Sequence, residues 1–159
     1  MIVLALGSSI EPKDKYLKDA LVEIEKKYPI LKKSKVYKTL AWGGVAKNEF
    51  LNMCIVIETQ EDAYKLLENC HEIEYRLGRT RDQHWADRTI DIDIILYNDD
   101  VYNDEKLIVP HKYIKDRNFV LKPLIDVVGD IELEDVKLST WLEKIKEKIE
   151  IIDIGVDNV

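Results

Sequence analysis

Residues 90–97 read Ile-Asp-Ile-Asp-Ile-Ile-Leu-Tyr, and this stretch decides the fold. Successive side chains of a strand point to opposite faces, so the isoleucines face a core while Asp91 and Asp93 share the other face. One apolar face and one polar face predict an antiparallel sheet with helices packed on one side. The other side and its loops then stay free for a ligand.

The segments before this strand alternate between helical and strand periodicity. In chain order the patterns predict a strand over 2–7, a helix over 12–28, a strand from Val36, a strand over 50–59, a helix over 63–77 and the strand over 90–97. This order, β-α-β-β-α-β, is that of the ferredoxin-like fold, an α+β sandwich.

The chain after Tyr97 predicts a C-terminal hairpin and further helices. Asn98-Asp99-Asp100 leads into a short return strand, and residues 110–128 hold a turn followed by a helix. A last helix is expected over 139–149, with Ser139 as its N-cap.

Composition narrows the class of protein. The 159 residues are 46% hydrophobic and 35% charged, which predicts a single globular domain over 1–159. A net charge of −7 argues against nucleic-acid binding, which usually needs a basic field. No apolar run is long enough to cross a membrane, and no signal-peptide pattern opens the chain. Cys54 and Cys70 lack CxxC spacing, so we expect reduced core residues of a cytoplasmic protein.

Arginine is concentrated beside the aspartate strand. Four of the five arginines lie within thirteen residues, and these are Arg76, Arg79, Arg81 and Arg88. Guanidinium groups bind phosphate oxygens two at a time. Two carboxylates about 6–7 Å apart at the strand repeat suit Mg²⁺ with a polyphosphate. The alternative is that the aspartates lie on a solvated sheet face and the arginines in a charged loop. For Arg76, on the preceding helix, we expect solvent exposure.

Other polar and aromatic residues each have a functional and a structural interpretation. His111, with Arg117 six residues on, is a second phosphate contact or a turn histidine. Trp85 stacks on a flat ring or packs in a satellite core. Asn52 projects an amide from a buried strand, where it serves a backbone loop or the polar edge of a heterocycle. Gly7-Ser8-Ser9 lacks the lysine of a Walker motif, so we interpret it as a tight exit from the first strand.

Several ordered motifs together carry a family resemblance. They are Leu6-Gly7-Ser8-Ser9, Tyr37-x-Thr39, Phe50-Leu51-Asn52, Glu74-x-x-x-Gly78-Arg79-x-Arg81, Trp85-x-x-Arg88-Thr89-Ile90-Asp91-Ile92-Asp93, Pro110-His111 and Arg117-x-Phe119-Val120-Leu121-x-Pro123-Leu124. From about residue 2 to residue 128 the chain resembles the 6-hydroxymethyl-7,8-dihydropterin pyrophosphokinase family of folate biosynthesis.

The resemblance implies a ferredoxin-like fold and the transfer of pyrophosphate from ATP to the hydroxymethyl group of 6-hydroxymethyl-7,8-dihydropterin, which leaves AMP. It implies that Asp91 and Asp93 hold two Mg²⁺ ions and that Arg79 and Arg88 are catalytic. The implied ATP-binding residues are Glu74, Arg79, Arg81, Arg88, His111 and Arg117. The implied pterin pocket consists of Thr39, Phe50, Asn52, Trp85 and Phe119.

Two loops depart from the family pattern. Residues 40–49 lack the usual prolines, and Ala86-Asp87 replace Gly-Pro after Trp85. We expect the loops over 40–49 and 79–89 to become ordered together when both substrates bind. The expected partners are the two small-molecule substrates, with the chain a monomer or associated with other folate enzymes. Two alternatives stay open, namely a magnesium-dependent phospho- or nucleotidyltransferase for another heterocycle and a ferredoxin-like binding module without turnover.

Overall fold

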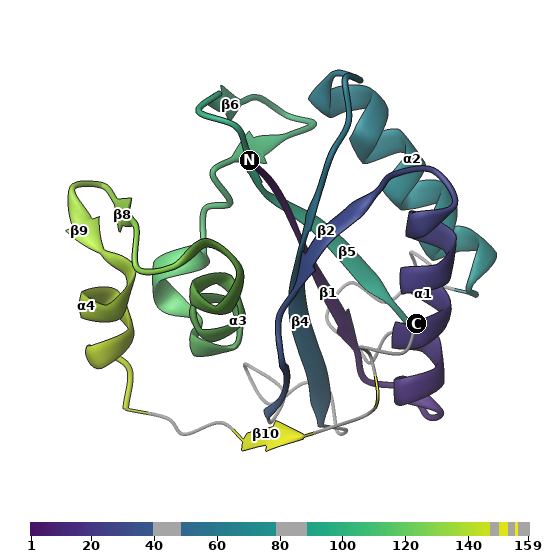
Figure 1. The fold of residues 1–159 in the computed structure, drawn as a ribbon, viewed down its shortest axis with the longest axis horizontal. Helices are drawn as coiled ribbons and strands as arrows, with labels where there is room; N and C mark the ends of the chain where they lie inside the picture. Colours follow the sequence, from purple (N-terminus) through teal and green to yellow (C-terminus); the bar gives the residue numbers. More distant parts are fainter. Residues whose placement is uncertain (40–48, 79–88, 147–149, 153–154, 156–159) are drawn as a thin grey trace.

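The computed structural model of the chain describes residues 1–39, 49–78, 89–146, 150–152 and 155. Within them the main sheet is antiparallel and has the strand order β10-β3-β4-β1-β5, with β2 also paired to β4 (Figure 1). Its strands are β1 (Ile2–Ser8), β2 (Ile30–Lys33), β3 (Val36–Thr39), β4 (Phe50–Ile57), β5 (Asp91–Tyr97) and β10 (Glu150–Ile152).

Helices lie on both sides of this sheet (Figure 1). α1 (Lys13–Glu25) and α2 (Ala63–Arg76) cover one face, where both bury apolar stripes against β1, β4 and β5. α2 begins at Asp62, whose carboxylate accepts a hydrogen bond from the Lys65 N–H at 2.8 Å. After its last turn Gly78 takes a φ of +89°, as expected of the glycine that ends a helix. The ferredoxin-like order predicted from the sequence is confirmed.

The second face of the sheet is not free, and this part of the prediction is wrong. α3 (Asn118–Val128) packs on it with an apolar face that includes Val120, Leu121 and Leu124. The partners of α3 on the sheet include Val3 and Val56. Because residues of both faces of β1 and β4 are apolar, the sheet buries both faces against helices.

β5 has the predicted polar and apolar faces over its first half. Ile90, Ile92 and Ile94 are buried on the α1–α2 side, while Asp91 and Asp93 are half-buried on the α3 side. The alternation of faces along β5 does not continue to Tyr97, however. Leu4 pairs with Ile94 and Val3 with Leu96, so Ile95 is an extra residue that bulges toward α3.

β2 was not expected, and it continues into β3 across a break at Ser34. The Ser34 N–H donates to the Cys54 carbonyl at 2.9 Å, and the Ser34 Oγ accepts from the Cys54 N–H at 2.9 Å. The hydroxyl therefore replaces a backbone acceptor where the two strands separate. It also donates to the Lys35 carbonyl at 2.7 Å.

The chain after β5 differs from the expected hairpin with that strand. β6 (Tyr102–Asn103) pairs with β7 (Ile108–Val109) in a separate sheet. Asp104 closes this hairpin because its carboxylate accepts hydrogen bonds from the N–H groups of Lys106 and Leu107. In the described part of the chain β5 thus remains an edge strand of the main sheet. A short 3₁₀ turn (Ile114–Asp116) precedes α3, as predicted.

The last helix is shorter than predicted. α4 (Leu138–Glu143) follows a hairpin of β8 (Glu132–Leu133) and β9 (Val136–Lys137). Ser139 lies inside α4 and is not its N-cap. Instead the Asp130 carboxylate accepts hydrogen bonds from the Ser139 N–H and hydroxyl, at 2.8 and 2.6 Å. Beyond α4 the chain leaves the helix and adds β10 to the edge of β3.

Cys54 and Cys70 are buried and form no disulfide. Burial raises the pKa of both thiols, which keeps them protonated and unreactive. None of the described helices combines the length and the apolar character needed to cross a membrane.

We expect Ser34→Ala to lower the free energy of unfolding by about 1–3 kcal/mol, because the buried Cys54 N–H then loses its acceptor. The exposed Lys32→Ala in β2 is the matched control and should change stability by much less. Urea denaturation of both variants measures the difference. Equal stabilities would show that Ser34 is not needed at the strand break.

Candidate functional site

Three adjacent strands bring the candidate residues into one row across the α3 face of the sheet. Gly7 of β1 pairs with Asn52 of β4 on one side and with Asp91 of β5 on the other. Residues paired in this way point to the same face. Two strand spacings put the α-carbons of Asn52 and Asp91 about 10 Å apart. Asp93 follows in the next row on that face, opposite Ala5.

Asn52 is a buried amide at one end of this row. The residue is 9% exposed, and its Nδ2 has no hydrogen-bond partner among the described residues. An amide that loses water and gains no partner costs free energy. The arrangement therefore suits a ligand that presents a hydrogen-bond acceptor at this point. Thr39 and Phe50 pair with each other near the same end of β4, next to the residues that lie outside the description.

The turn before α3 brings basic and aromatic groups toward β5. The Arg117 guanidinium carbon lies 4.6 Å from the centroid of the Tyr113 ring and 5.6 Å from that of the Phe119 ring. Two aromatic faces therefore restrict the guanidinium before any ligand binds.

His111 is fixed beside β5 by its backbone and its ring. Its N–H donates to the Ile95 carbonyl at 3.1 Å, and its Nδ1 accepts from the Tyr113 N–H at 3.3 Å. Burial, followed by the charges of Arg117 and Lys112, lowers the pKa of His111, while the Asp91 carboxylate acts in the opposite direction. The imidazole is thus neutral near pH 7, with its proton on Nε2 as a donor.

A cleft of about 270 Å³ joins two of the predicted residues, Asp93 and His111. Leu67 and His71 of α2 form one wall, and residues 104–108 of the β6–β7 hairpin form another. These wall residues were not predicted from the sequence to contact a ligand. The spacing of Leu67, His71 and Glu74 at i, i+4 and i+7 was a usable signal, since it puts them on one face of a helix.

Glu74 lies under the aspartate pair rather than in the lining of this cleft. It is 3% exposed, and its carboxylate accepts a hydrogen bond from the Ile92 N–H at 2.7 Å. Ile92 stands between Asp91 and Asp93 on an edge strand, so this bond ties the strand to α2. In the described part of the chain Glu74 thus positions the two aspartates.

The donor set of Asp91 and Asp93 fits Mg²⁺ bound together with phosphate. Both side chains are half-buried on one face of β5. Among the described residues no three His, Cys, Asp or Glu side chains gather as a metal cage. Mg²⁺ commonly takes one or two carboxylates and completes its shell with water and substrate phosphates. A polyphosphate substrate is therefore the natural source of the remaining ligands.

The predicted residues fall into two groups. The structure describes Thr39, Phe50, Asn52, Glu74, Asp91, Asp93, His111, Arg117 and Phe119. Arg79, Arg81, Trp85 and Arg88 lie outside the described residues, as do 40–48 and 79–88 of the two predicted loops.

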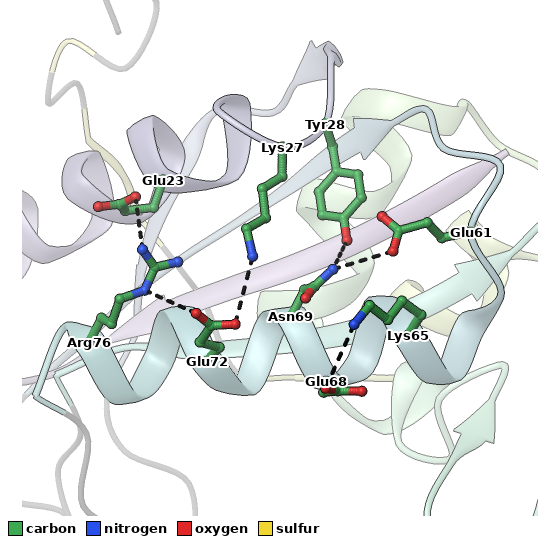
Figure 2. A network of polar contacts seen from close by, with 9 residues as sticks. All are labelled: Glu23, Lys27, Tyr28, Glu61, Lys65, Glu68, Asn69, Glu72 and Arg76. Carbon is green, nitrogen blue, oxygen red and sulfur yellow. Dashed lines mark hydrogen bonds and ion pairs between the residues drawn. The ribbon is translucent and has the colours of Figure 1, made fainter.

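Arg76 stands apart from the site, as predicted. Figure 2 shows it on α2 between Glu23 of α1 and Glu72, at 3.7 and 3.9 Å. Glu72 also lies 3.7 Å from the Lys27 ammonium. These half-exposed ion pairs link the two helices and add little stability each.

Comparison with known proteins gives one family. The chain matches the model of 7,8-dihydro-6-hydroxymethylpterin-pyrophosphokinase (HPPK) over residues 3–129. A 2-amino-4-hydroxy-6-hydroxymethyldihydropteridine pyrophosphokinase from Bacillus subtilis is 37% identical over 145 residues, which are 90% of this chain and 87% of that protein. The protein of the same name from Methylorubrum extorquens is 36% identical and covers 89% and 91% of the two chains. The bifunctional protein FolKE of Lactococcus lactis subsp. cremoris is 40% identical over 80% of this chain and 37% of its own length.

Solved structures of Plasmodium falciparum HPPK-DHPS share the fold. The wild-type protein with pteroate aligns with a TM-score of 0.72 at 16% identity, over 90% of this chain and 44% of that chain. The wild-type structure without a named ligand gives 0.71 at 16% identity, again over 44% of its length. The chain therefore spans less than half the length of these neighbours, and at 16% identity the likeness shows the fold alone.

We expect Glu74→Ala to lower the free energy of unfolding by about 1–3 kcal/mol, since the buried Ile92 N–H loses this acceptor. Glu72→Ala, on the exposed side of the same helix, is the control and should cost less. Chemical denaturation measures both. A loss at Glu74 no larger than at Glu72 would contradict a role in holding β5.

We expect His111 to titrate below its ordinary pKa and Arg117→Gln to move that pKa upward, because the substitution removes a neighbouring positive charge. Ring chemical shifts followed by NMR from pH 4 to 8 measure both values, with the exposed Lys144→Gln as a control. An unchanged His111 pKa in Arg117→Gln would show that the Arg117 charge does not contribute to it.

Proposed function

Because the chain belongs to the 7,8-dihydro-6-hydroxymethylpterin-pyrophosphokinase family, we propose that it transfers pyrophosphate from ATP to the hydroxymethyl oxygen of 6-hydroxymethyl-7,8-dihydropterin. The products are AMP and the pterin diphosphate, and the step belongs to folate biosynthesis. The family match confirms the family that the sequence motifs predicted.

One observation supports this reaction most directly, namely the row formed by Asn52, Gly7 and Asp91. In this row a buried amide, whose nitrogen has no hydrogen-bond partner among the described residues, lies on the same face as a carboxylate pair. A flat heterocycle held at Asn52 directs its side arm along this row toward Asp91 and Asp93. An acceptor alcohol and a metal-bound polyphosphate are thereby brought to one point on the sheet.

Each described residue has a part in this proposal. Asp91 and Asp93 hold two Mg²⁺ ions, which neutralise phosphate charge when bound. His111 donates from Nε2 toward a phosphate oxygen, and Arg117 presents a guanidinium already held by two rings. Glu74 keeps β5 in place beneath the aspartates. Its role in ATP binding follows from the family resemblance.

The nucleotide occupies the cleft between α2 and the β6–β7 hairpin. Asp93 and His111 line this cleft, so a nucleotide there has its phosphates next to the acceptor row. Leu67 and Leu107 supply apolar contacts to a base, and the Lys106 ammonium supplies positive charge.

The pterin occupies the other end of the row. Phe119 and the Asn52 carboxamide bind the ring, together with Thr39 and Phe50. Trp85 completes the pterin pocket, Arg79 and Arg88 stabilise the transferred phosphates, and Arg81 binds ATP. The roles of these last four residues follow from the family resemblance.

We also propose how the chain is organised. Residues 1–159 form a single pyrophosphokinase domain that acts as a monomer in the cytoplasm. The two unbonded, buried cysteines fit a reducing compartment.

We expect Asp91→Asn and Asp93→Asn each to reduce turnover at least about 100-fold, because the loss of metal neutralisation costs several kcal/mol of barrier. AMP formed from ATP, Mg²⁺ and 6-hydroxymethyl-7,8-dihydropterin is the readout, with the exposed Asp100→Asn as a control. Wild-type rates in either variant at saturating Mg²⁺ would refute the metal assignment. A wild-type protein that binds the pterin but forms no AMP would be a binding module.

A further inference from the structure

Gly7 lies inside a strand, which is an unfavourable place for glycine. β1 runs through Gly7 and ends at Ser8, so the strand ends within the predicted exit 7–9 and Gly7 itself still belongs to the strand. The backbone at Gly7 does not adopt the positive φ that only glycine tolerates easily, in contrast to Gly78 at +89°. Glycine costs about 0.5–1 kcal/mol relative to alanine in a strand. Its presence at this position therefore calls for a reason other than backbone conformation.

The reason is the closeness of one side chain. A Cβ atom placed on Gly7 would lie 2.9 Å from Oδ1 of Asn52, which is closer than real Cβ contacts come. The next nearest atom from another residue is the Leu51 carbonyl oxygen at 3.7 Å, an ordinary contact distance. The Asn52 carboxamide thus lies across the backbone of β1 in the space that a side chain at position 7 would fill.

We propose that Gly7 is a positioning residue for the pterin, because the Asn52 carboxamide occupies the space that a side chain at position 7 would fill. We call this space the seat of the carboxamide. This inference rests on the function proposed above. The carboxamide is buried, and its nitrogen has no partner among the described residues, so the seat fixes the direction in which a ring can be bound. Any larger residue at position 7 forces Asn52 to rotate away from this orientation.

The seat also sets the distance between the two halves of the site. Gly7 is the direct strand neighbour of both Asn52 and Asp91. A carboxamide displaced from β1 carries the ring, and with it the hydroxymethyl oxygen, away from the carboxylates. Transfer reactions depend steeply on such placement. Gly7 therefore influences pterin affinity and turnover without contacting the reacting atoms.

The test is a double-mutant cycle of Gly7→Ala and Asn52→Ala, with 6-hydroxymethylpterin titrated in the presence of Mg²⁺ and a non-hydrolysable ATP analogue. Gly7→Ala should weaken pterin affinity about tenfold, the equivalent of one lost hydrogen bond. In the Asn52→Ala background the same substitution should change the affinity less than about twofold, because the conflicting oxygen is gone. Affinity for the ATP analogue alone should be unchanged in Gly7→Ala.

Three results would overturn the inference. They are a Gly7→Ala variant with wild-type pterin affinity, a Gly7→Ala effect of equal size in both backgrounds, and an equal loss of affinity for the ATP analogue.

Thermal unfolding is the measurement to use if Gly7→Ala does not fold. The double variant should then fold like Asn52→Ala, since the nearest remaining atom is at 3.7 Å, and its failure to fold would also refute the seat. A wild-type protein without pterin binding or AMP formation would instead refute the proposed function.

Discussion

The pairing of β1 with β4 on one side and β5 on the other is the constraint on which the rest of the structure depends. It aligns Gly7 with Asn52 and with Asp91. A slip of one residue in either ladder would turn the polar side chains into the α1–α2 core and the isoleucines out of it. Because apolar residues of all three strands are buried on that side, the register is strongly fixed. The geometry of the site follows from this hydrophobic preference.

Helices on the two faces have different consequences for the site. α1 and α2 cover their face, and Glu74 of α2 reaches the edge of β5 beneath the aspartates. α3 is attached to the other face at its far end, where the Tyr37 hydroxyl donates to the Asp126 carboxylate at 2.8 Å. Burial and this bond raise the pKa of Tyr37, which keeps its proton in place. The aspartates on the α3 face remain only half-buried.

Several features that cost free energy of folding are concentrated at the candidate site. Asn52 buries an amide nitrogen without a partner in the described residues, Gly7 puts an unfavourable strand residue beside it, and His111 is held neutral among charged neighbours. Each of these features disfavours the ligand-free state slightly. A ligand with an acceptor edge gives the Asn52 nitrogen a partner, and a polyphosphate offsets the positive charges around His111. Binding sites commonly contain such local departures from what is best for folding.

Periodicity in the sequence determined the main elements, the faces of β5 and the separation of Asp91 and Asp93 from the core. Ordered motifs determined the family. These features follow from local spacing, so no tertiary information was needed. The extra residue at Ile95, the packing of α3 on the second face, the bond from Glu74 to Ile92 and the contact of Gly7 with Asn52 were decided by the tertiary structure alone. Each depends on two segments far apart in the chain, and their register is set only when the sheet is assembled and its faces are buried.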